Sequence, residues 1–487
     1  MKVIERHFMN ANQKYEEGEK LMKKLLVILL VVMAAFSVFA KGAAETAPAA
    51  VEKESHIPTG TPPAETIELI MWDDMNLEVD AVFQKAAADF NASQSQYHVT
   101  VVFTDGVQSK MLSSTPADRP NIIQTTGNQS SKYINPHIDS RIPDLNLYVP
   151  LQEFIDYENY DTSGFIANTS AICIRGGEWQ MFPIGNVAVG LFTNTDMLAA
   201  IGMSVDDIKS YQDVYEACLK MKEQGVCATP MYTYIHIDPF NFAVRSEGIE
   251  LFNYNNGRDA IPDQYFFGEG DAKEAVVEWF KFWQNMRDAG LLVQTDVPRG
   301  DAIQMFGNGE IAFYPMYLDY FAQFAKASEG INWEFICSPT VREGKANLGQ
   351  SPGGIFAMVC DVDDPWKEYG SWLFVKWLEQ PEYSAGTALG VGYTPTVVAA
   401  RDYPTYQEYL KKYPYMNKVI DIQNNTEYGL TMPLLAYHGD FANAYKSILT
   451  EIVKEGSTLT AEEAWKQLCT AAEETRDMYF LQAGVVL

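Results

Sequence analysis

Positive charge is scarce in this sequence. Its 487 residues include 36 lysines and arginines against 64 aspartates and glutamates, which gives a formal net charge of −28 at pH 7. A chain with this balance repels nucleic acid and anionic membrane surfaces, so neither is expected as a partner.

Cysteine and histidine are also scarce, with six of each. The cysteines are widely spaced and form no CxxC motif or cluster with histidine, so the sequence predicts no metal site and no cofactor. Cys218 and Cys227 are close enough along the chain to pair across one helix-to-strand turn. The alternative is that both stay buried free thiols, since a chain of this length can build a core without disulfides.

Long apolar runs are missing except near the start of the chain. The run from Leu25 to Phe36 follows Lys23 and Lys24 and precedes Val38-Phe39-Ala40, an order typical of a secretory signal peptide cleaved after Ala40. The run is shorter than the roughly 20 residues of a membrane-spanning helix, although a membrane anchor remains the alternative. Residues 1–40 are therefore predicted to be an upstream segment and a signal peptide, with translation starting at Met1 or Met22.

The next segment, residues 41–65, is rich in alanine, proline, threonine and glutamate. Such a segment buries too little apolar surface to become ordered, so we predict a disordered linker. No cysteine that could carry a lipid follows the cleavage site. This favours a free protein in a closed compartment such as the periplasm.

The rest of the sequence alternates between expected strands and helices. Residues 66–72, 97–103 and 121–124 have the pattern of strands, and residues 79–90 between the first two have apolar positions at helical spacing. Such βαβ units imply a parallel sheet. The pattern resumes with a strand at 187–192. Because single cores rarely exceed roughly 250–300 residues, we expect an α/β fold with two lobes.

Two later helix starts are marked by capping residues. Asp364 precedes Pro365, and Thr460 precedes Glu463 by three residues, which is a capping-box pattern. Both signals predict scaffold and no chemistry.

Two short motifs suggest chemistry and fail on mechanism. Gly349 to Gly353 matches the GxSxG motif of serine hydrolases, but the residue after the serine is Pro352, which has no N–H for an oxyanion hole, and a strand rather than a helix is expected next. Asp361 to Asp364 resembles a calcium loop, but Trp366 occupies the position that requires glycine. We interpret it as a strand-to-helix turn.

Paired carboxylates for glycoside hydrolysis could come from Asp73, Asp74, Glu178 or Asp319. Nothing in the sequence places any two at catalytic separation, so we predict that the protein is not an enzyme. An exported carbohydrate-active enzyme and a secreted adhesin or sensor subunit remain alternatives.

Polar and aromatic residues follow the predicted strands. Trp72-Asp73-Asp74 and Thr125 to Gln129 stand at the carboxyl ends of two strands, where open parallel sheets bind ligands. Aromatic residues make up 13% of the chain, and tyrosine is the commonest of them at 27. Aromatic faces with nearby hydrogen-bonding groups suit a hydroxyl-rich ligand, although for any single aromatic residue core packing is the more ordinary role.

Four stretches in order carry a family resemblance. They are IELIMWDDMN with AVFQKAAADFNAS, FPIGNVAVGLFTNTDMLAAIGM, AIQMFGNGEIAFYPMYLDYF, and SPGGIFAMV with WLFVKWLEQPEYSAGTALGVGYTPTVVAA. Together they span about residues 67–475 and resemble the extracellular solute-binding proteins of family 1, the sugar-type substrate-binding components of ABC importers.

The resemblance implies a two-lobed, periplasmic-binding-protein-like fold of type II that is hinged by crossing strands. By analogy, residues 66–184 and 338–378 form the N-lobe, and residues 185–337 and 379–487 form the C-lobe. It also implies a monomer that binds a small-molecule ligand and delivers it to the membrane permease without catalysis.

Two departures from the family bear on the ligand. Tyr317-Leu318-Asp319 stands where the family often has Gly-x-Trp, and Gly390 stands where its glycerol-3-phosphate binders have an arginine for the phosphate. We therefore expect a neutral mono- or oligosaccharide, with glycerol-3-phosphate or a related polyol phosphate as the alternative. The expected ligand-binding residues are Trp72, Asp73, Asp74, Asn128, Asn186, Tyr317, Asp319, Gly353, Gly354 and Tyr393.

Overall fold

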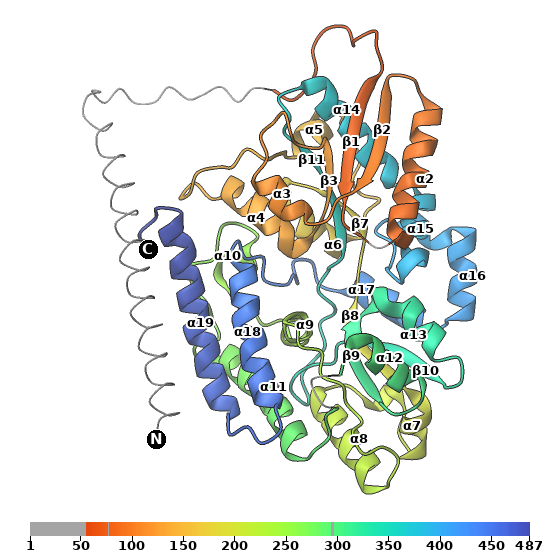
Figure 1. Cartoon of the computed structure of the whole chain (residues 1–487), viewed down its shortest axis with the longest axis vertical. Helices are drawn as coiled ribbons and strands as arrows, with labels where there is room; N and C mark the ends of the chain where they lie inside the picture. The colour runs from red at the N-terminus through yellow and green to blue at the C-terminus, as the bar shows by residue number, and fades with distance from the viewer. Residues whose placement is uncertain (1–54, 76, 294–296) are drawn as a thin grey trace, which may run out of the picture. The chain divides into compact units, whose positions relative to one another are not determined.

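The computed structural model describes residues 55–487 except Asn76 and residues 294–296 (Figure 1). The predicted signal peptide and the linker up to residue 54 lie outside the described residues. Residues 55–487 form one compact unit of the chain. Within this unit, no helix is long and apolar enough to cross a membrane.

The first sheet has six strands in the order β2-β1-β3-β11-β4, with β7 also pairing with β11. The strands are β1 (Ile67–Asp73), β2 (Tyr97–Phe103), β3 (Ile122–Thr126), β4 (Tyr148–Val149), β7 (Phe182–Gly185) and β11 (Ile355–Cys360). Burial alternates along β1 and β2, as the sequence pattern predicts for strands with one covered face.

The direction of these strands differs in part from the prediction. β1 pairs in parallel with β2 and β3, as expected of the βαβ units. β11, however, runs antiparallel to β3, β4 and β7, so the sheet is mixed and not purely parallel. β11 is not connected to β3 by a local crossover; it enters the sheet from a distant part of the chain, and its own sequence pattern does not encode its direction.

Helices cover this sheet. In Figure 1, α2 lies beside β2, and α14 lies close to β1 and β11. The helices and the small hairpin of this region are α2 (Leu77–Ser93), α3 (Val107–Leu112), α4 (Gly127–Ile138), α5 (Gln152–Glu158), α6 (Ala167–Cys173), β5 (Ile174–Arg175), β6 (Glu178–Trp179), α14 (Pro365–Leu378) and α15 (Pro381–Val391).

The second sheet is antiparallel, with β8 (Val189–Asn194) between β9 (Phe313–Tyr317) and β10 (Trp333–Cys337). The chain passes from β7 directly into β8, so residues 186–188 join the two sheets. The stacked rings of Phe192 and Phe324, with centroids 3.7 Å apart, continue the apolar core of the first sheet into the second.

A helical layer completes the second region. α11 (Gly270–Asp288), α18 (His438–Val453) and α19 (Ala461–Gln482) pack together around a second core, in which Trp279 Nε1 donates to the Tyr445 hydroxyl at 2.8 Å. The remaining elements are α7 (Thr195–Ala200), η1 (Val205–Asp207), α8 (Tyr211–Glu223), α9 (Asp238–Ser246), α10 (Asn253–Gly257), α12 (Arg299–Gly307), η2 (Leu318–Tyr320), α13 (Phe321–Ala327), η3 (Val398–Asp402), α16 (Pro404–Lys412) and α17 (Met416–Asn425).

Both predicted caps are confirmed. The Asp364 carboxylate accepts from the backbone N–H groups of Trp366 and Lys367 at the start of α14, so the segment from Asp361 is a strand-to-helix turn as expected. Thr460 and Glu463 form a capping box at the start of α19. The strand β11 follows the GxSxG motif, as predicted, and Ser351 is fully buried.

The structure distinguishes a disulfide between Cys218 and Cys227 from a pair of buried free thiols. All six are free thiols, and Cys218 and Cys227 are both buried, so the disulfide alternative is wrong for this pair. Burial of each thiol raises its pKa, which also keeps it unreactive.

Candidate functional site

The first group of polar side chains lies at the carboxyl ends of β1 and β3, which meet at one edge because the two strands are parallel. We call it the first-sheet edge, and its members are Asp73, Asp74, Gln124 and Asn128. Asp73 is buried, with its Oδ1 accepting from the Met75 N–H at 3.1 Å, and the Asp74 N–H donates to Gln124 Oε1 at 3.4 Å.

Three buried atoms of the first-sheet edge have no hydrogen-bond partner among the described residues: Asp73 Oδ2, Gln124 Nε2 and Asn128 Oδ1. Burial raises the pKa of Asp73 to about 6 and also raises the pKa of Asp74. Buried polar groups are normally hydrogen-bonded, so three orphan atoms on neighbouring strand ends mark a place suited to a polar ligand.

The position of Asn128 is fixed by the start of α4. Thr126 caps this helix in a capping box with Gln129. The fully buried Arg175 donates to the Gly127 carbonyl at 3.1 Å and to the Ser130 hydroxyl at 2.8 Å, which ties the first turn of α4 to the hairpin β5–β6. Asn128 is therefore presented from a rigid support.

Trp72 lies differently from its neighbours. Residues alternate between the two faces of a strand, and in β1 Trp72 shares a face with the exposed Ile70, while Asp73 shares the opposite face with the buried Met71. Trp72 is half-buried and packs against the first core. The strand therefore does not bring Trp72 and Asp73 together on one face.

The second group lies where the chain crosses between the sheets. Asn186 forms an isolated bridge with Thr394, its Nδ2 donates to Thr169 Oγ1 at 3.1 Å, and its Oδ1 accepts from the Gly353 N–H at 3.3 Å. Gly354 has φ +105°, and a Cβ there would lie 2.0 Å from the Gly185 carbonyl oxygen. These residues hold crossing segments together, and both polar ends of the Asn186 side chain are used within the protein.

The third group surrounds the end of β9, beside the start of β8. Tyr317 is half-buried, and its hydroxyl donates to the Asp238 carboxylate and lies 3.1 Å from His236 Nδ1. Asp319 has a buried Oδ1 with no partner in the described part of the chain, and burial raises its pKa to about 7. Tyr393 is buried, and Asp319 is among the charges that raise its pKa beyond the effect of burial.

The structure adds residues that the sequence analysis missed. Tyr234 stacks on His236 with ring centroids 5.3 Å apart and meets the Tyr317 ring edge-on at 6.0 Å. The Arg299 guanidinium lies over the rings of Tyr234 and Tyr320, at 5.7 and 5.0 Å from their centroids. We call the whole group the second-sheet cluster, and its members are Tyr234, His236, Asp238, Arg299, Tyr317, Asp319 and Tyr320.

A signal for part of this cluster was present in the sequence. Tyr232, Tyr234, His236 and Asp238 alternate in the stretch YTYIHID, which is the pattern of side chains along one face of an extended segment. The segment runs beside β9, because the Tyr232 N–H donates to the Phe313 carbonyl at 3.1 Å. Arg299 had no comparable signal.

The structure divides most of the expected ligand-binding residues into three groups, one at the crossing segments and one beside each sheet. Asn186, Gly353 and Gly354 are in contact at the crossing, Asp73, Asp74 and Asn128 lie at the first-sheet edge, and Tyr317, Asp319 and Tyr393 lie by the second sheet. Glu178, a candidate for acid catalysis, is exposed in the β5–β6 hairpin, where it stands opposite Arg175 in the backbone register of the two strands.

A sheet on each side of crossing segments, with orphan polar atoms beside one sheet and an aromatic cluster beside the other, is the architecture of a two-lobed binding protein. The comparison with protein families agrees: residues 85–414 match the bacterial extracellular solute-binding proteins. Since the match covers about two thirds of the chain, the protein belongs to this family.

One curated relative is the sn-glycerol-3-phosphate-binding periplasmic protein UgpB of Yersinia enterocolitica. It is 23% identical over 366 residues, which cover 71% of this chain and 78% of the relative. At this identity it supports the class of protein, and its printed ligand is a property of that relative.

Solved structures with the same fold include sugar receptors. The sugar-binding protein MalE of Xanthomonas citri has a TM-score of 0.68 at 16% identity, covering 85% of this chain and 98% of that one. The GacH receptor of Streptomyces glaucescens, described unliganded and with acarbose, has a TM-score of 0.64 at 15% identity. The match covers 85% of this chain and 99% of that one. The two-lobed periplasmic-binding-protein-like fold expected from the sequence is thus confirmed.

Proposed function

We propose that this protein is the substrate-binding component of an ABC importer and that it captures a neutral mono- or oligosaccharide. One observation carries the ligand class. Four buried polar atoms, on Asp73, Gln124, Asn128 and Asp319, lack partners in residues 55–487 as described, and Asp319 belongs to the tyrosine-rich second-sheet cluster. Sugar hydroxyls would satisfy such atoms, while the apolar faces of sugar rings would cover the tyrosines.

The lobes follow the two sheets in this proposal. Residues 66–184 and 338–378 form the N-lobe and residues 185–337 and 379–487 the C-lobe, and the chain bends at the crossing segments near Asn186 and Gly353. Closure of the lobes would bring the first-sheet edge and the second-sheet cluster onto one ligand. The fold shared with MalE and the GacH receptor, whose printed titles name sugar ligands, supports this ligand class.

The neutral ligand is favoured over a phosphorylated one for two reasons. Gly390 occupies the position where the family's glycerol-3-phosphate binders have a phosphate-binding arginine, and the chain as a whole is strongly acidic. Arg299 is the one cation of the second-sheet cluster, and its guanidinium faces aromatic rings and the Tyr320 hydroxyl. It therefore serves better as a stacking partner than as a free anion receptor.

Export follows from the same proposal. A member of an extracellular family with the predicted signal peptide is delivered to the periplasm, where a monomer carries ligand to the permease subunits. It acts without catalysis and without a nucleic-acid partner.

The test is a thermal-shift screen of neutral sugars, maltooligosaccharides and glycerol phosphates on the mature protein. A ligand at 100 times its Kd should add about 2.7 kcal/mol of stability. Stabilisation by neutral sugars together with contraction in small-angle scattering supports the proposal. Stabilisation by glycerol-3-phosphate alone would establish the alternative ligand, and turnover of a chromogenic glycoside would replace transport with catalysis.

A further inference from the structure

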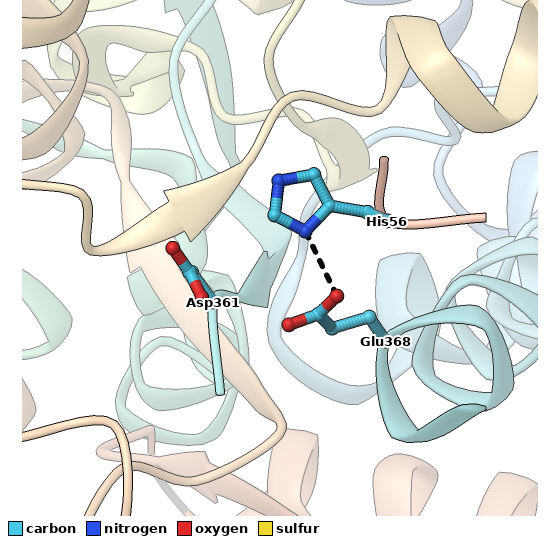
Figure 2. Close-up of side chains that lie close together, drawn as sticks. All are labelled: His56, Asp361 and Glu368. Atoms are coloured by element: carbon cyan, nitrogen blue, oxygen red, sulfur yellow. Dashed lines mark hydrogen bonds and ion pairs between the residues drawn. The ribbon is translucent and has the colours of Figure 1, made fainter. Parts of the chain in front are cut away.

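The structure brings together a histidine and two carboxylates that the sequence separates widely. His56 precedes β1, Asp361 directly follows β11, and Glu368 lies on the first turns of α14. One ligand atom from each residue lies within 4.8 Å of the other two. Figure 2 shows the imidazole of His56 facing the Glu368 carboxylate, with Asp361 beside it.

This cluster is distinct from the proposed sugar site. β11 runs antiparallel to β3, so its carboxyl end, with Asp361, lies beside the beginning of β3. The first-sheet edge lies at the opposite end of β3, after Thr126. A ligand at His56 and Asp361 therefore does not compete with a sugar.

Both carboxylates of the cluster are held in place by further hydrogen bonds. Glu368 is 1% exposed, and its Oε1 accepts from the backbone N–H groups of Val362 and Asp364 at 3.0 and 3.4 Å, which leaves Oε2 directed at His56 Nδ1 at 2.8 Å. The Asp361 Oδ1 accepts from the Asp363 N–H at 3.2 Å. Supporting hydrogen bonds of this kind orient metal ligands in proteins.

The N-terminal segment is held by a second carboxylate. The Ser55 hydroxyl and the His56 backbone N–H both donate to Glu153 Oε1, at 2.9 and 3.0 Å. These contacts dock the last part of the predicted linker onto the sheet, although residues 55–65 contain no helix or strand. The docked segment presents the imidazole to Glu368.

The local charge favours a cation. Three carboxylates surround His56: those of Asp361 and Glu368 have ligand atoms within 4.8 Å of its imidazole nitrogen, and that of Glu153 accepts from its backbone N–H. The Arg119 guanidinium donates to the backbone carbonyl of Asp361 at 2.7 Å, and no hydrogen bond joins it to the Asp361 carboxylate among the described residues. A doubly charged ion would offset the negative charge of the Asp361 and Glu368 carboxylates more fully than a proton on His56.

We propose that His56, Asp361 and Glu368 bind a divalent transition-metal ion, Zn²⁺, which fastens the N-terminal segment to the first sheet. One imidazole and two carboxylates are ligands that zinc accepts, and water completes its coordination. Zinc–ligand bonds of about 2.0–2.1 Å put neighbouring tetrahedral ligands about 3.3 Å apart. The His56 and Glu368 atoms must separate slightly, and Asp361 must move closer, for the ion to enter. The ion takes the Nδ1 lone pair of His56, so the neutral imidazole then carries its one proton on Nε2.

The test is calorimetric titration of Zn²⁺ into mature protein freed of metal with a chelator. We expect one site in the wild type, and His56→Ala or Glu368→Gln should weaken it by at least about tenfold, since even supporting residues of zinc sites have effects of that size. His98→Ala, which removes an exposed histidine of β2, is the matched control and should leave the site unchanged. Ca²⁺, which prefers oxygen ligands, should show no dependence on His56.

A second measurement guards against a folding defect and tests the docking. Zn²⁺ should slow tryptic cleavage after Lys53 in the wild type and not in His56→Ala, while the two metal-free proteins bind sugar alike. Zinc binding of equal strength in His56→Ala and the wild type, or no site at all in the wild type, would overturn the proposal.

Discussion

The first-sheet edge and the second-sheet cluster are built on opposite principles. At the first-sheet edge, rigid backbone supports present buried polar atoms that have no partner in the described chain, on Asp73, Gln124 and Asn128. In the second-sheet cluster, most polar atoms are already paired: the Tyr317 hydroxyl with Asp238 and His236, and Arg299 with the Tyr320 hydroxyl.

This difference indicates a division of labour. Paired hydroxyls fix the orientation of tyrosine rings, so the second-sheet cluster offers a preformed stacking surface whose stability does not depend on ligand. The unpaired atoms of the first-sheet edge cost stability until a ligand satisfies them. We therefore expect substitutions at the two places to separate binding from stability in opposite ways.

Asp319 is the exception within the second-sheet cluster, and replacing it gives the largest expected effect. Its folded-state pKa of about 7 lies above the ordinary aspartate value of 3.8, so the unfolded chain loses this proton first as pH rises. Its contribution to stability is present below pH 4 and is lost as pH rises to about 7. Between pH 5 and pH 8, wild type should lose about 2–3 kcal/mol relative to Asp319→Asn.

Urea denaturation of the ligand-free proteins at both pH values measures this difference. Asp301→Asn, which changes an exposed carboxylate on α12, is the control and should track the wild type. Parallel pH profiles for wild type and Asp319→Asn would mean that the Asp319 carboxylate is well solvated and that the second-sheet cluster has no exception.

Tyr317 tests the stacking surface itself. Tyr317→Ala should weaken sugar binding by about 2 kcal/mol, roughly 30-fold, because it removes a ring face and uncovers the edge of Tyr234. It should also destabilise the ligand-free protein, since Asp238 loses its hydrogen-bond donor.

Tyr317→Phe separates the two roles of this residue. It keeps the ring and removes the hydroxyl, so it should lower stability while retaining most of the affinity measured by calorimetry. Equal losses of affinity in the two variants would assign the binding energy to the hydroxyl and would contradict a stacking surface.

Asn128 tests the first-sheet edge, with a smaller effect. Asn128→Ala removes an unpartnered buried carbonyl, so ligand-free stability should stay the same or rise, while sugar affinity falls by about 1 kcal/mol, roughly fivefold. Thermal unfolding with and without sugar measures both quantities on one sample. A loss of ligand-free stability as large as the loss of binding would show that Asn128 serves the fold.

The scaffold of the site was predictable from the sequence because its signals are local. The strand β1 and the helix α2 show their period within a few residues. The caps at Asp364 and Thr460 each depend on groups no more than three positions further along the chain. The direction of β11 was not predictable, because strand direction depends on where the chain enters the sheet.

The candidate site was predictable only where it follows a strand end. Asp73 and Asn128 were found in this way, and Tyr317 and Asp319 through a family resemblance. Arg299 was missed because its contacts with Tyr234 and Tyr320 join a helix start to two separate segments, with no spacing that marks it. His56 was missed for the same reason, since its partner Glu368 is 312 residues away.

Arg299 gives the last and smallest prediction. As an exposed cation over two tyrosine rings it should contribute about 0.5–1 kcal/mol, so Arg299→Gln should weaken binding of a neutral sugar by about two- to fivefold. Arg299→Lys keeps the charge and loses the planar guanidinium, so it should behave like the glutamine variant if stacking is the role.

With a neutral ligand, raising the salt concentration should change none of these affinities appreciably, because no ion pair joins ligand to protein. Calorimetry of the three proteins at low and high salt decides the point. The opposite outcome is an affinity that falls steeply with salt in the wild type and in Arg299→Lys but not in Arg299→Gln. It would mean that Arg299 holds an anionic group and that the second-sheet cluster is a charged receptor instead of a stacking surface.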